Sequence, residues 1–520
     1  MPGTFTRDEA RERLATERFD LLVIGGGIVG AGIAAEAARA GARVALVDRG
    51  DFAGATSSAS SKLIHGGLRY LRLGDVRLVR EAHDERRALM RIVAPHLVRR
   101  LLFLLPLYRG GPYGAATVQT GLFLYSALAR ARLHRPIRGA AARRLVPPLR
   151  LDGLRACGVY ADAWTHDSRL CLANVRAAAE AGATVLNYAE AVELRIDRGR
   201  VAGAEVAAGG TTISARARAV VNATGPWVDR VRRLEDPVAP RSVRLSKGVH
   251  ALLDLEEPWR AGLTIPHDTV RVSFALPWEG MLLIGTTDTL HEGEPDEIEV
   301  TEGDLAQVLD EASTALDAAV DRDRVRAAFA GLRALPGGEG TTPTARRETV
   351  FTRGRCGMLS VAGGKLTTYR RIALDALAAL RSELGLARLD RRPRPLPGAA
   401  DPDVVAARLA RGWPELDAEI AVQLAHLYGA LAEEVLAPAH EDPSLLEPLH
   451  PDGGDLAAQA LYARTHEWAL HPDDVLRRRT TLALRGLATP SVVSSVETLL
   501  RSSPAREATP ASARDSAPAR

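Results

Sequence analysis

The stretch FDLLVIGGGIVGAGIAAEAARAGARVALVD, residues 19–48, decides the fold. It begins with a short apolar strand, continues as a helix rich in small residues that ends near Gly41, and finishes with a second apolar strand. Gly25, Gly27 and Gly30 form a G-x-G-x-x-G pattern between the first strand and the helix. The first glycine of such a pattern permits a tight turn, the second lets the backbone approach a pyrophosphate, and the third brings the helix close to the strand. The stretch therefore predicts a β-α-β unit of the Rossmann type.

Asp48 ends the second strand, where a carboxylate can accept hydrogen bonds from ribose hydroxyls. The helix N-terminus in front of it supplies N–H donors and a positive dipole for phosphate. Only one such glycine pattern occurs, which disfavours a flavin reductase driven by a pyridine nucleotide, because that class needs a second nucleotide unit. Two glycine turns much later in the chain, at Gly225 and near Lys365, are expected to contact the same cofactor. We therefore expect one permanently bound flavin dinucleotide rather than an exchanging NAD.

Composition sets broad limits on the class of protein. The chain has 520 residues, of which 46% are hydrophobic, 25% charged and 4% aromatic, which excludes a disordered chain, a collagen and a disulfide scaffold. At roughly 150 residues per domain, the length predicts about three domains or two large ones. The three cysteines show no metal spacing and indicate a reducing compartment. No secretory signal is expected, and the longest apolar run, residues 21–35, is shorter than the roughly 20 residues that span a bilayer.

The positive charge is distributed unevenly between two residue types. Lys and Arg total 68, yet lysine stands only at Lys62, Lys247 and Lys365, each beside Gly or Ser. Because lysine is a compact ammonium whose pKa shifts on burial, we expect these lysines to belong to a site. Nucleic acid is not expected as a partner, since the basic segments lack interleaved aromatic residues. No metal is expected either, because the histidines lack an H-E-x-x-H pattern.

Two further segments carry polar chemistry. GDFAGATSSASSKLIHGGLRYL, at residues 50–71, is dense in hydroxyls and glycine and holds Lys62, His65, Arg69 and Tyr70. Such donors suit a phosphate-rich cofactor or an anionic substrate. In CGMLSVAGGKLTTYRRIALDALAAL, from residue 356, a strand meets two glycines and a helix begins near Lys365. A lysine and a helix N-terminus in one place form a second anion-binding arrangement.

The rest of the chain is expected to build a substrate domain and a helical domain. Residues 241–290 alternate like antiparallel strands, with turn residues at 278–280, and predict a sheet inserted into the nucleotide domain. Residues 76–150 are rich in Arg and Leu, and the run 97–138 can lie as a basic amphipathic surface on anionic lipid. The alternative is an ordinary helical insertion whose arginines are solvated. A proline-rich linker near residue 394 precedes a helical region that reaches about residue 500.

Seven strings together resemble one family: DLLVIGGGIVGAGIA, TSSASSKLIHGGLRYL, NATGPWV, KGVH, IGTTDT, GLRAL and GGKLTTYR. That family is the FAD-dependent, membrane-associated glycerol-3-phosphate dehydrogenases, and the likeness runs from about residue 19 to about 490. PDDVLRRRT, at residues 472–480, is similar to the family's C-terminal helical domain. The resemblance implies FAD, oxidation of sn-glycerol 3-phosphate to dihydroxyacetone phosphate, and electron delivery to a membrane quinone. It also implies a cytoplasmic protein peripherally associated with the inner face of the cell membrane, and it leaves a homodimer open.

The resemblance also implies an α/β fold: an FAD-binding Rossmann-type domain, an inserted antiparallel-sheet substrate domain and a C-terminal helical domain. The expected divisions are an N-terminal extension at 1–18, an oxidoreductase region at 19–392, the helical domain at 393–500 and a disordered tail at 501–520. Within the oxidoreductase region, FAD-binding segments are expected at about 19–75, 155–235 and 345–385, and substrate segments at about 76–154 and 236–344.

Individual site residues are carried over from the matching strings. The residues expected to hold FAD are Gly25, Gly27, Gly30, Asp48, Thr56, Ser57, Ser58, Ser61, Lys62, Leu63, His65, Gly67, Leu68, Gly225, Pro226, Asp288, Gly364, Lys365, Leu366 and Thr367. The residues expected to bind substrate are Arg69, Tyr70, His250, Arg333 and Arg346. The three arginines suit the phosphate dianion, which favours guanidinium forks. The residues expected to act in catalysis are His65, Lys365 and Arg333. Lys365 would stabilise charge on the reduced flavin, and the base is expected to be His65, with His250 as the second candidate.

Two other activities remain open, and the first of them occurs within the same family. A glycerol-3-phosphate oxidase would perform the same chemistry but pass electrons to oxygen and release peroxide. An amine or amino-acid oxidase of the same broad fold would need only one carboxylate-binding arginine, and SSKLIHGGLRYL would be unexpected there.

Overall fold

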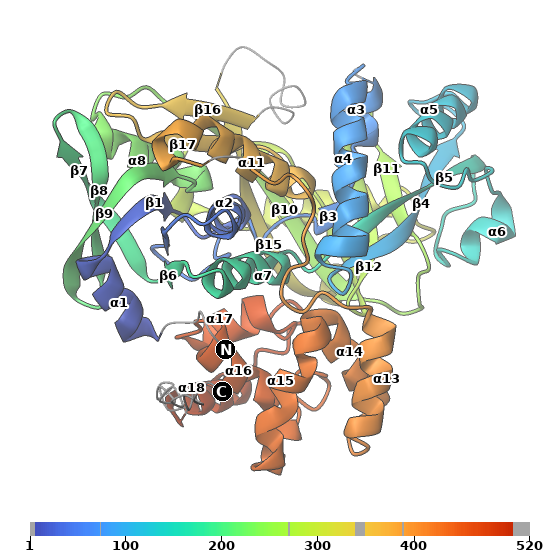
Figure 1. Ribbon diagram of the computed structural model, residues 1–520. Helices are drawn as coiled ribbons and strands as arrows, with labels where there is room; N and C mark the ends of the chain where they lie inside the picture. Colours follow the sequence, from blue (N-terminus) through green and yellow to red (C-terminus); the bar gives the residue numbers. More distant parts are fainter. Residues whose placement is uncertain (1–5, 73, 269–270, 338–348, 387–388, 503–520) are drawn as a thin grey trace, which may run out of the picture.

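The computed structural model describes residues 6–72, 74–268, 271–337, 349–386 and 389–502. Two sheets lie side by side in the upper part of Figure 1, and a helical domain lies below them. Arg346 and the tail from residue 503 fall outside the described residues.

The first sheet contains the predicted β-α-β unit, formed by β1 (Arg18–Ile24), α2 (Ile28–Arg39) and β2 (Val44–Val47). β1 lies between β2 and β9 (Thr211–Asn222) and runs parallel to both, with Val23 opposite Leu46 and Val221. The strand order is β16-β17-β9-β1-β2-β6, and β7 and β8 extend the sheet from β9. The other strands are β6 (Thr184–Leu186), β7 (Ala189–Asp197), β8 (Arg200–Ala208), β16 (Thr349–Arg353) and β17 (Leu359–Gly363). The prediction of a Rossmann-type domain is confirmed.

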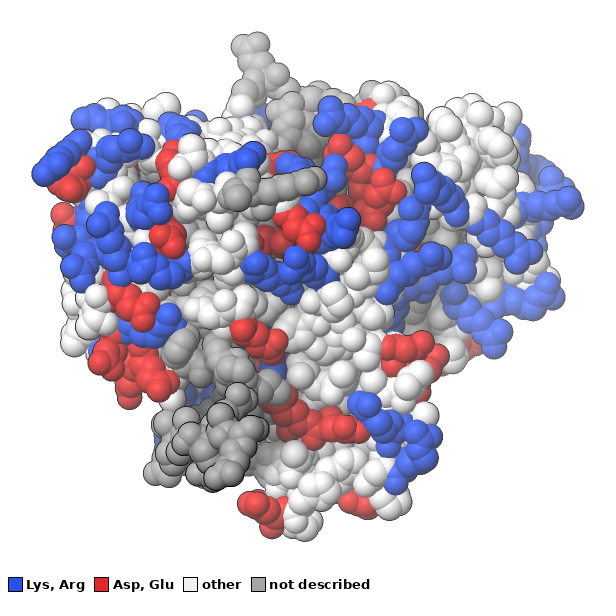
Figure 2. All heavy atoms as spheres, in the orientation of Figure 1, with Lys and Arg blue, Asp and Glu red and all other residues white. Residues whose placement is uncertain are grey.

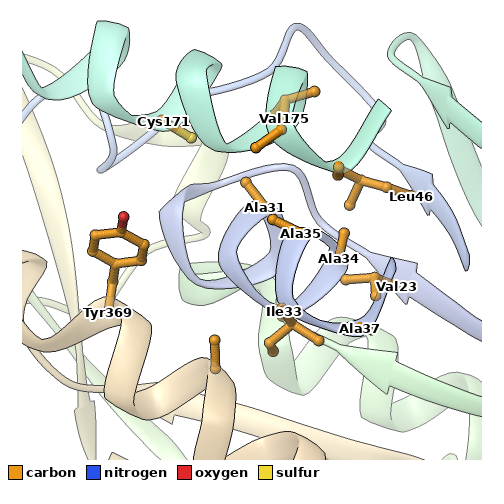
Figure 3. Close-up of a cluster of buried hydrophobic side chains, with 14 of the residues drawn as sticks. Val23, Ala31, Ile33, Ala34, Ala35, Ala37, Leu46, Cys171, Val175 and Tyr369 are labelled. Atoms are coloured by element: carbon orange, nitrogen blue, oxygen red, sulfur yellow. The ribbon is translucent and has the colours of Figure 1, made fainter. Parts of the chain in front are cut away.

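Small side chains on α2 allow two other helices to approach it closely. Figure 3 shows Ala31 and Ala35 turned toward α7 (Asp167–Glu180) and Ile33 turned toward α11 (Tyr369–Ala379). A Cβ at Gly32 would lie 3.0 Å from the Tyr369 ring, so a larger residue there would push α11 away. The close packing fixes the N-terminus of α2, where the glycine turn lies. The opposite face of the sheet is covered by α1 (Arg7–Thr16) and closed near β17 by α8 (Val228–Glu235).

The second sheet is mainly antiparallel, and its strand order is β14-β10-β13-β12-β11-β4-β5-β3, with β15 paired to β10. Its strands are β3 (Leu63–Ile64), β4 (Val98–Tyr108), β5 (Leu154–Thr165), β10 (Val243–Asp254), β11 (Gly262–Pro266), β12 (Val272–Trp278), β13 (Met281–Gly285), β14 (Thr289–His291) and β15 (Val325–Pro336). The predicted turn joins β12 to β13: Trp278 pairs with Met281, and Glu279 and Gly280 both have positive φ, as a two-residue hairpin turn requires. The inserted antiparallel sheet is therefore confirmed.

The structure differs from the sequence prediction at β4 and β5. These strands pair antiparallel from Val98 to Tyr108, so residues 154–165 belong to the second sheet and not to the Rossmann-type sheet. Phe103 and Leu104 in β4 are buried, because they pack into hydrophobic clusters on the two faces of the sheet. Residues 98–108 are therefore an interior strand, and the expectation of a lipid-facing surface there is wrong. Only the later part of the run 97–138 lies outside, on α5 (Ala115–Leu128) and the loop that follows.

The helices of the second sheet are α3 (Leu68–Arg72), α4 (Val76–Ala88), α5, α6 (Gly139–Arg143) and α9 (Glu302–Ser313). The C-terminal domain consists mainly of α13 (Pro402–Gly412), α14 (Ala418–Tyr428), α15 (Ala432–Leu436), α16 (Ala457–His466), α17 (Pro472–Asp474) and α18 (Pro490–Ser502). One helical run in the described chain, Ala418–His440, has the length and apolar composition of a membrane span, and half of it is buried. Leu424, Leu427 and Val435 in this run pack into the core of the helical domain, which accounts for its hydropathy.

Candidate functional site

A cavity of about 1180 Å³ is lined by residues of both sheets. Its size exceeds the roughly 300–1,000 Å³ typical of sites for drug-sized ligands. The first sheet contributes the ends of β1 and β17 and the residues after β9, and strands of the second sheet that contribute include β10, β12 and β15. The cavity can therefore hold a large cofactor and a small substrate next to each other.

The glycine turn forms one wall of this cavity. Gly25 has φ +106°, and a Cβ there would lie 2.7 Å from the carbonyl oxygen of Ala223, so the turn requires glycine. A Cβ at Gly30 would collide with the carbonyl oxygen of Gly25, which holds α2 against the turn. Gly27 is the N-cap of α2, and Ser57 Oγ accepts a hydrogen bond from the next amide at 2.9 Å. The arrangement gives a phosphate group direct access to backbone N–H donors at a helix N-terminus.

Asp48 is half-buried and directly follows β2. Its two carboxylate oxygens accept hydrogen bonds from Gly26 N at 2.6 Å and Gly50 N at 2.9 Å. Burial raises the pKa of Asp48 to about 6, although both backbone donors oppose the shift. At neutral pH the group is therefore mainly ionised, and it faces the cavity as an acceptor for hydroxyl groups.

The Ser/Gly segment at residues 50–71 runs along the cavity and links the two sheets. Thr56 Oγ1 donates to the carbonyl of Leu332 on β15 at 2.7 Å, and Ser61 Oγ lies 2.8 Å from His250 Nε2 on β10. Of the residues predicted in this segment, those that line the cavity are Thr56, Ser57, Ser61, Leu63, His65, Gly67, Leu68 and Tyr70. Ser58 is not among the lining residues, because its hydroxyl bonds back to the carbonyl of Ala55 at 3.1 Å.

The three lysines have different environments. Lys62 is buried, and its ammonium donates to Asp167 at 2.6 Å, so its charge serves an internal ion pair and does not line the cavity. Lys247 donates to Asp304 at 2.6 Å and also lies outside the lining. Lys365 does line the cavity, and its Nζ lies 3.4 Å from the centroid of the Tyr70 ring, a cation–π contact. Only Lys365 therefore remains a candidate for direct contact with a ligand.

Two late segments of the chain also line the cavity. Gly225 and Pro226 begin a short 3-10 turn (Gly225–Trp227) at the end of β9. Gly364 and Lys365 precede a second 3-10 turn (Leu366–Thr368), after which α11 begins. Thr367 Oγ1 accepts from His65 N at 3.0 Å and donates to His65 O at 3.2 Å, which joins this second turn to the Ser/Gly segment.

Arg333 and His250 lie on neighbouring strands at the second-sheet side. Arg333 donates from Nη2 to Thr286 Oγ1 at 2.9 Å and from Nη1 to Ser246 Oγ at 3.3 Å. His250 is buried and stacked on Phe329, with ring centroids 5.0 Å apart. Burial, together with the charges of Arg333 and Lys62, lowers the pKa of His250 well below its usual value, so its ring is neutral at neutral pH.

The remaining predicted residues are placed as follows. Asp288 is exposed, accepts from Ser246 Oγ at 2.5 Å and lies 3.8 Å from Arg333 Nη1, outside the cavity lining. Its carboxylate is therefore a neighbour of Arg333 and not part of the wall. Gly30 is one turn behind the wall, within α2. Arg69 is the second residue of α3, and its side chain is outside the described part of the structure.

Sequence reasoning missed several charged residues that line the cavity, namely Arg49, Asp51, Asp162, Glu190, Arg230 and Arg478. Asp162, in β5, accepts hydrogen bonds from Tyr125 at 2.8 Å and Gly66 N at 3.2 Å and pairs with Arg86. An aspartate inside the apolar strand VYADAWT was the signal that could have indicated it. Arg478 comes from the C-terminal domain, and PDDVLRRRT had indicated only a family likeness there.

Comparisons with known proteins follow the same division of the chain. A family model described as FAD dependent oxidoreductase matches residues 20–370, and one described as the C-terminal domain of alpha-glycerophosphate oxidase matches residues 392–503. A glycerol-3-phosphate dehydrogenase of Mycobacterium leprae is 37% identical over 520 residues, which covers 95% of this chain and 87% of the relative. The chain belongs to the FAD-dependent glycerol-3-phosphate dehydrogenase family.

Two further relatives of this dehydrogenase family extend the likeness. The aerobic glycerol-3-phosphate dehydrogenase of Escherichia coli is 36% identical over 482 residues, covering 89% of this chain and 94% of the relative. The glycerol-3-phosphate dehydrogenase from Bacillus halodurans, solved in complex with FAD, has a TM-score of 0.77 and 28% identity, covering 95% of this chain and 93% of that one. A glycine oxidase from Geobacillus kaustophilus has a TM-score of 0.53 and 22% identity and shares the fold alone.

FAD, the cofactor of this dehydrogenase family, fits the cavity of the protein. The glycine turn admits a pyrophosphate where any Cβ would collide, and Asp48 offers a carboxylate to ribose hydroxyls. Lys365 and Thr367, at the other side of the cavity, suit the polar edge of a flavin.

Proposed function

We propose that this protein oxidises sn-glycerol 3-phosphate to dihydroxyacetone phosphate with FAD as its cofactor and a membrane quinone as its electron acceptor. One observation carries the proposal: a single cavity joins the glycine turn and Asp48 to Arg333, His65 and Lys365. The residues around the glycine turn would hold FAD, which would supply the oxidant for removal of a hydride from C2 of the alcohol. All further steps fall to the side chains around it.

Binding of the substrate phosphate is assigned first to Arg333. Its guanidinium is fixed by Thr286 and Ser246, so it presents a charge of fixed position toward the cavity. A pre-oriented guanidinium loses less side-chain entropy when it binds phosphate than a free one does. Arg69, Tyr70 and Arg346 are proposed as further substrate contacts on the likeness to the family. Lys365 is proposed to stabilise negative charge that develops on the cofactor during reduction.

A base must remove the proton of the C2 hydroxyl, and two histidines line the cavity. Burial lowers the pKa of His250 well below its usual value, which makes that ring a weak base. His250 is also held by Ser61 at 2.8 Å and by stacking on Phe329. His65 is only half-buried, and its backbone is fixed on both sides by Thr367. We therefore assign proton removal to His65 and a positioning role to His250.

Access from a membrane is proposed through α5. Residues of this helix line one end of the cavity, and Leu124 both lines the cavity and is 43% exposed. Phe123, beside it, is 55% exposed, and the loop after α5 carries the exposed arginines Arg130, Arg132 and Arg135. Figure 2 shows an uncharged lobe over α5 at the upper right, next to a band of basic residues. An apolar tip with basic flanks suits peripheral attachment to an anionic bilayer, with a quinone entering from the lipid.

The test of the proposal is anaerobic reduction of the purified, FAD-loaded protein. We expect sn-glycerol 3-phosphate to bleach the flavin absorbance and the mirror-image sn-glycerol 1-phosphate to leave it unchanged. A protein that binds no FAD, or that stays oxidised with the substrate, would refute the proposal. Oxygen is the alternative acceptor, because the matched C-terminal model takes its description from a glycerophosphate oxidase. If the protein forms about one peroxide per substrate oxidised and reduces no quinone, the electron acceptor is oxygen and not a quinone.

A further inference from the structure

The C-terminal helical domain reaches the cofactor cavity through one short segment. Arg478 and Arg479 lie in the turn of helix at Val475–Arg479, directly after α17, and Arg478 lines the cavity. Both guanidinium groups bind Asp51, in the loop after β2. Arg478 Nε lies 2.5 Å from Asp51 Oδ2, and Arg479 Nη2 lies 2.9 Å from Asp51 Oδ1. Asp51 is 4% exposed and Arg479 is 0% exposed, so solvent screens these charges little.

The same cluster holds a second cavity-lining segment. Asp474 accepts hydrogen bonds from Arg478 Nη2 at 2.7 Å and from Tyr188 OH at 2.6 Å. Tyr188, which lines the cavity, also donates its backbone N–H to the carbonyl of Gly50 at 2.9 Å. The C-terminal domain thus clamps two chain segments that flank Asp48 on the cavity wall.

The charges of this cluster are balanced only when the domains are docked. Two carboxylates, Asp51 and Asp474, meet two guanidinium groups, Arg478 and Arg479. Burial alone would raise the pKa of Asp51, but the charges of Arg479 and Arg478 hold that pKa below its usual range. Asp51 also adds to the raised pKa of Asp48, so an Asp51 without its arginines would repel the Asp48 charge. Removing one partner of a buried ion pair leaves an uncompensated charge.

We propose that the C-terminal domain is a cofactor clamp, in which Arg478 and Arg479 act as positioning residues that fix the Asp48 loop around the adenosine half of FAD. The inference rests on the flavin cofactor of the proposed function, and it adds a role for the C-terminal domain. Asp48 faces the end of the cavity where ribose hydroxyls are expected, and Arg478 lies at the same end with Asp51 and Tyr188. Among the described residues that line the cavity, none from the C-terminal domain lies at the flavin end, which is marked by Lys365 and Thr367.

The test compares two Arg-to-Lys substitutions at the same domain interface in the full chain. Arg478→Lys keeps the charge but loses the fork that joins Asp51 to Asp474. Arg169→Lys is the matched control: Arg169, on α7, pairs with Glu467 of the C-terminal domain at 2.7 Å, both are 5% exposed, and neither lines the cavity. Affinities of the apoproteins are measured for FAD, for ADP, which lacks the flavin, and for FMN, which lacks the adenosine.

We expect Arg478→Lys to weaken binding of FAD and ADP tenfold or more while FMN binding stays unchanged. Arg169→Lys should lower the melting temperature of the apoprotein and leave all three affinities as in the wild type. Equal FAD and ADP affinity in Arg478→Lys and wild type would overturn the clamp, and so would an equal loss for FAD and FMN. Should Arg478→Lys not fold, Asp474→Asn, which removes the shared acceptor of Arg478 and Tyr188, must show the same pattern. A wild-type chain that binds no FAD would refute the proposed function as well.

Discussion

Replacing Arg333 with methionine tests the assignment of the phosphate-binding group. Methionine keeps much of the apolar stem and removes the charge and its donors. Arg333 donates to Thr286 Oγ1, Ser246 Oγ and the carbonyl of Thr287, at 2.9, 3.3 and 3.3 Å. These three acceptors hold the guanidinium in place before substrate arrives, so the loss should fall on substrate binding and not on FAD content.

The magnitude follows from the burial of Arg333. Loss of one partner of a buried, hydrogen-bonded charge pair costs about 2–5 kcal/mol. The side chain of Arg333 is 23% exposed, and solvent screening therefore favours the lower part of that range, about 2–3 kcal/mol. Since about 1.4 kcal/mol corresponds to a factor of ten, we expect kcat/KM for sn-glycerol 3-phosphate to fall about 30- to 150-fold, mainly through KM.

The assay is steady-state dye reduction by FAD-loaded protein, with the flavin content of each preparation measured by absorbance. Arg326→Met is the matched control, because Arg326 lies on the same strand, β15, and pairs with Asp254 at the surface with 52% exposure. We expect that control to match the wild type. A change of less than threefold in kcat/KM for Arg333→Met, or an equal change in Arg326→Met, would refute the assignment of Arg333.

Three further outcomes are expected. His65→Gln should slow flavin reduction by FAD-loaded protein about a hundredfold or more in stopped flow, as expected for loss of a general base, and a larger loss in His250→Gln would reverse the two roles. Burial lowers the pKa of His83 to about 3, so its stabilising contribution is present above pH 6.5 and is lost as pH falls. Urea titrations give the free energy of unfolding at pH 7 and at pH 5. Between these two pH values, His83→Phe should lose about 2 kcal/mol less of this free energy than the wild type loses. An equal loss in the two proteins would contradict this prediction. Phe123→Glu should reduce sedimentation with anionic liposomes and quinone reduction but not dye reduction, whereas Val238→Glu, at an 85% exposed position, should change none of them. Equal behaviour of these two variants would remove α5 as the membrane contact.

Sequence alone determined the features that depend on neighbouring residues. The glycine turn and α2 form as predicted because the positive φ of Gly25 and the contact of Gly30 with the Gly25 carbonyl both arise within the β-α-β unit. The hairpin between β12 and β13 is equally local, since Glu279 and Gly280 adopt the positive φ that the turn needs. Local backbone geometry of this kind requires particular residue types at fixed spacings, so it can be predicted from the sequence.

Tertiary structure decided which polar groups face the cavity. Lys62 and Lys365 stand in similar Gly/Ser strings, yet Asp167, which follows 105 residues after Lys62, takes up the charge of Lys62 inside the protein. Arg478 reaches the cavity wall only because its partner Asp51, 427 residues earlier in the chain, is buried between two domains. Ion pairs between distant segments depend on which residues are buried and on how the domains pack together. Neither can be predicted from the local sequence.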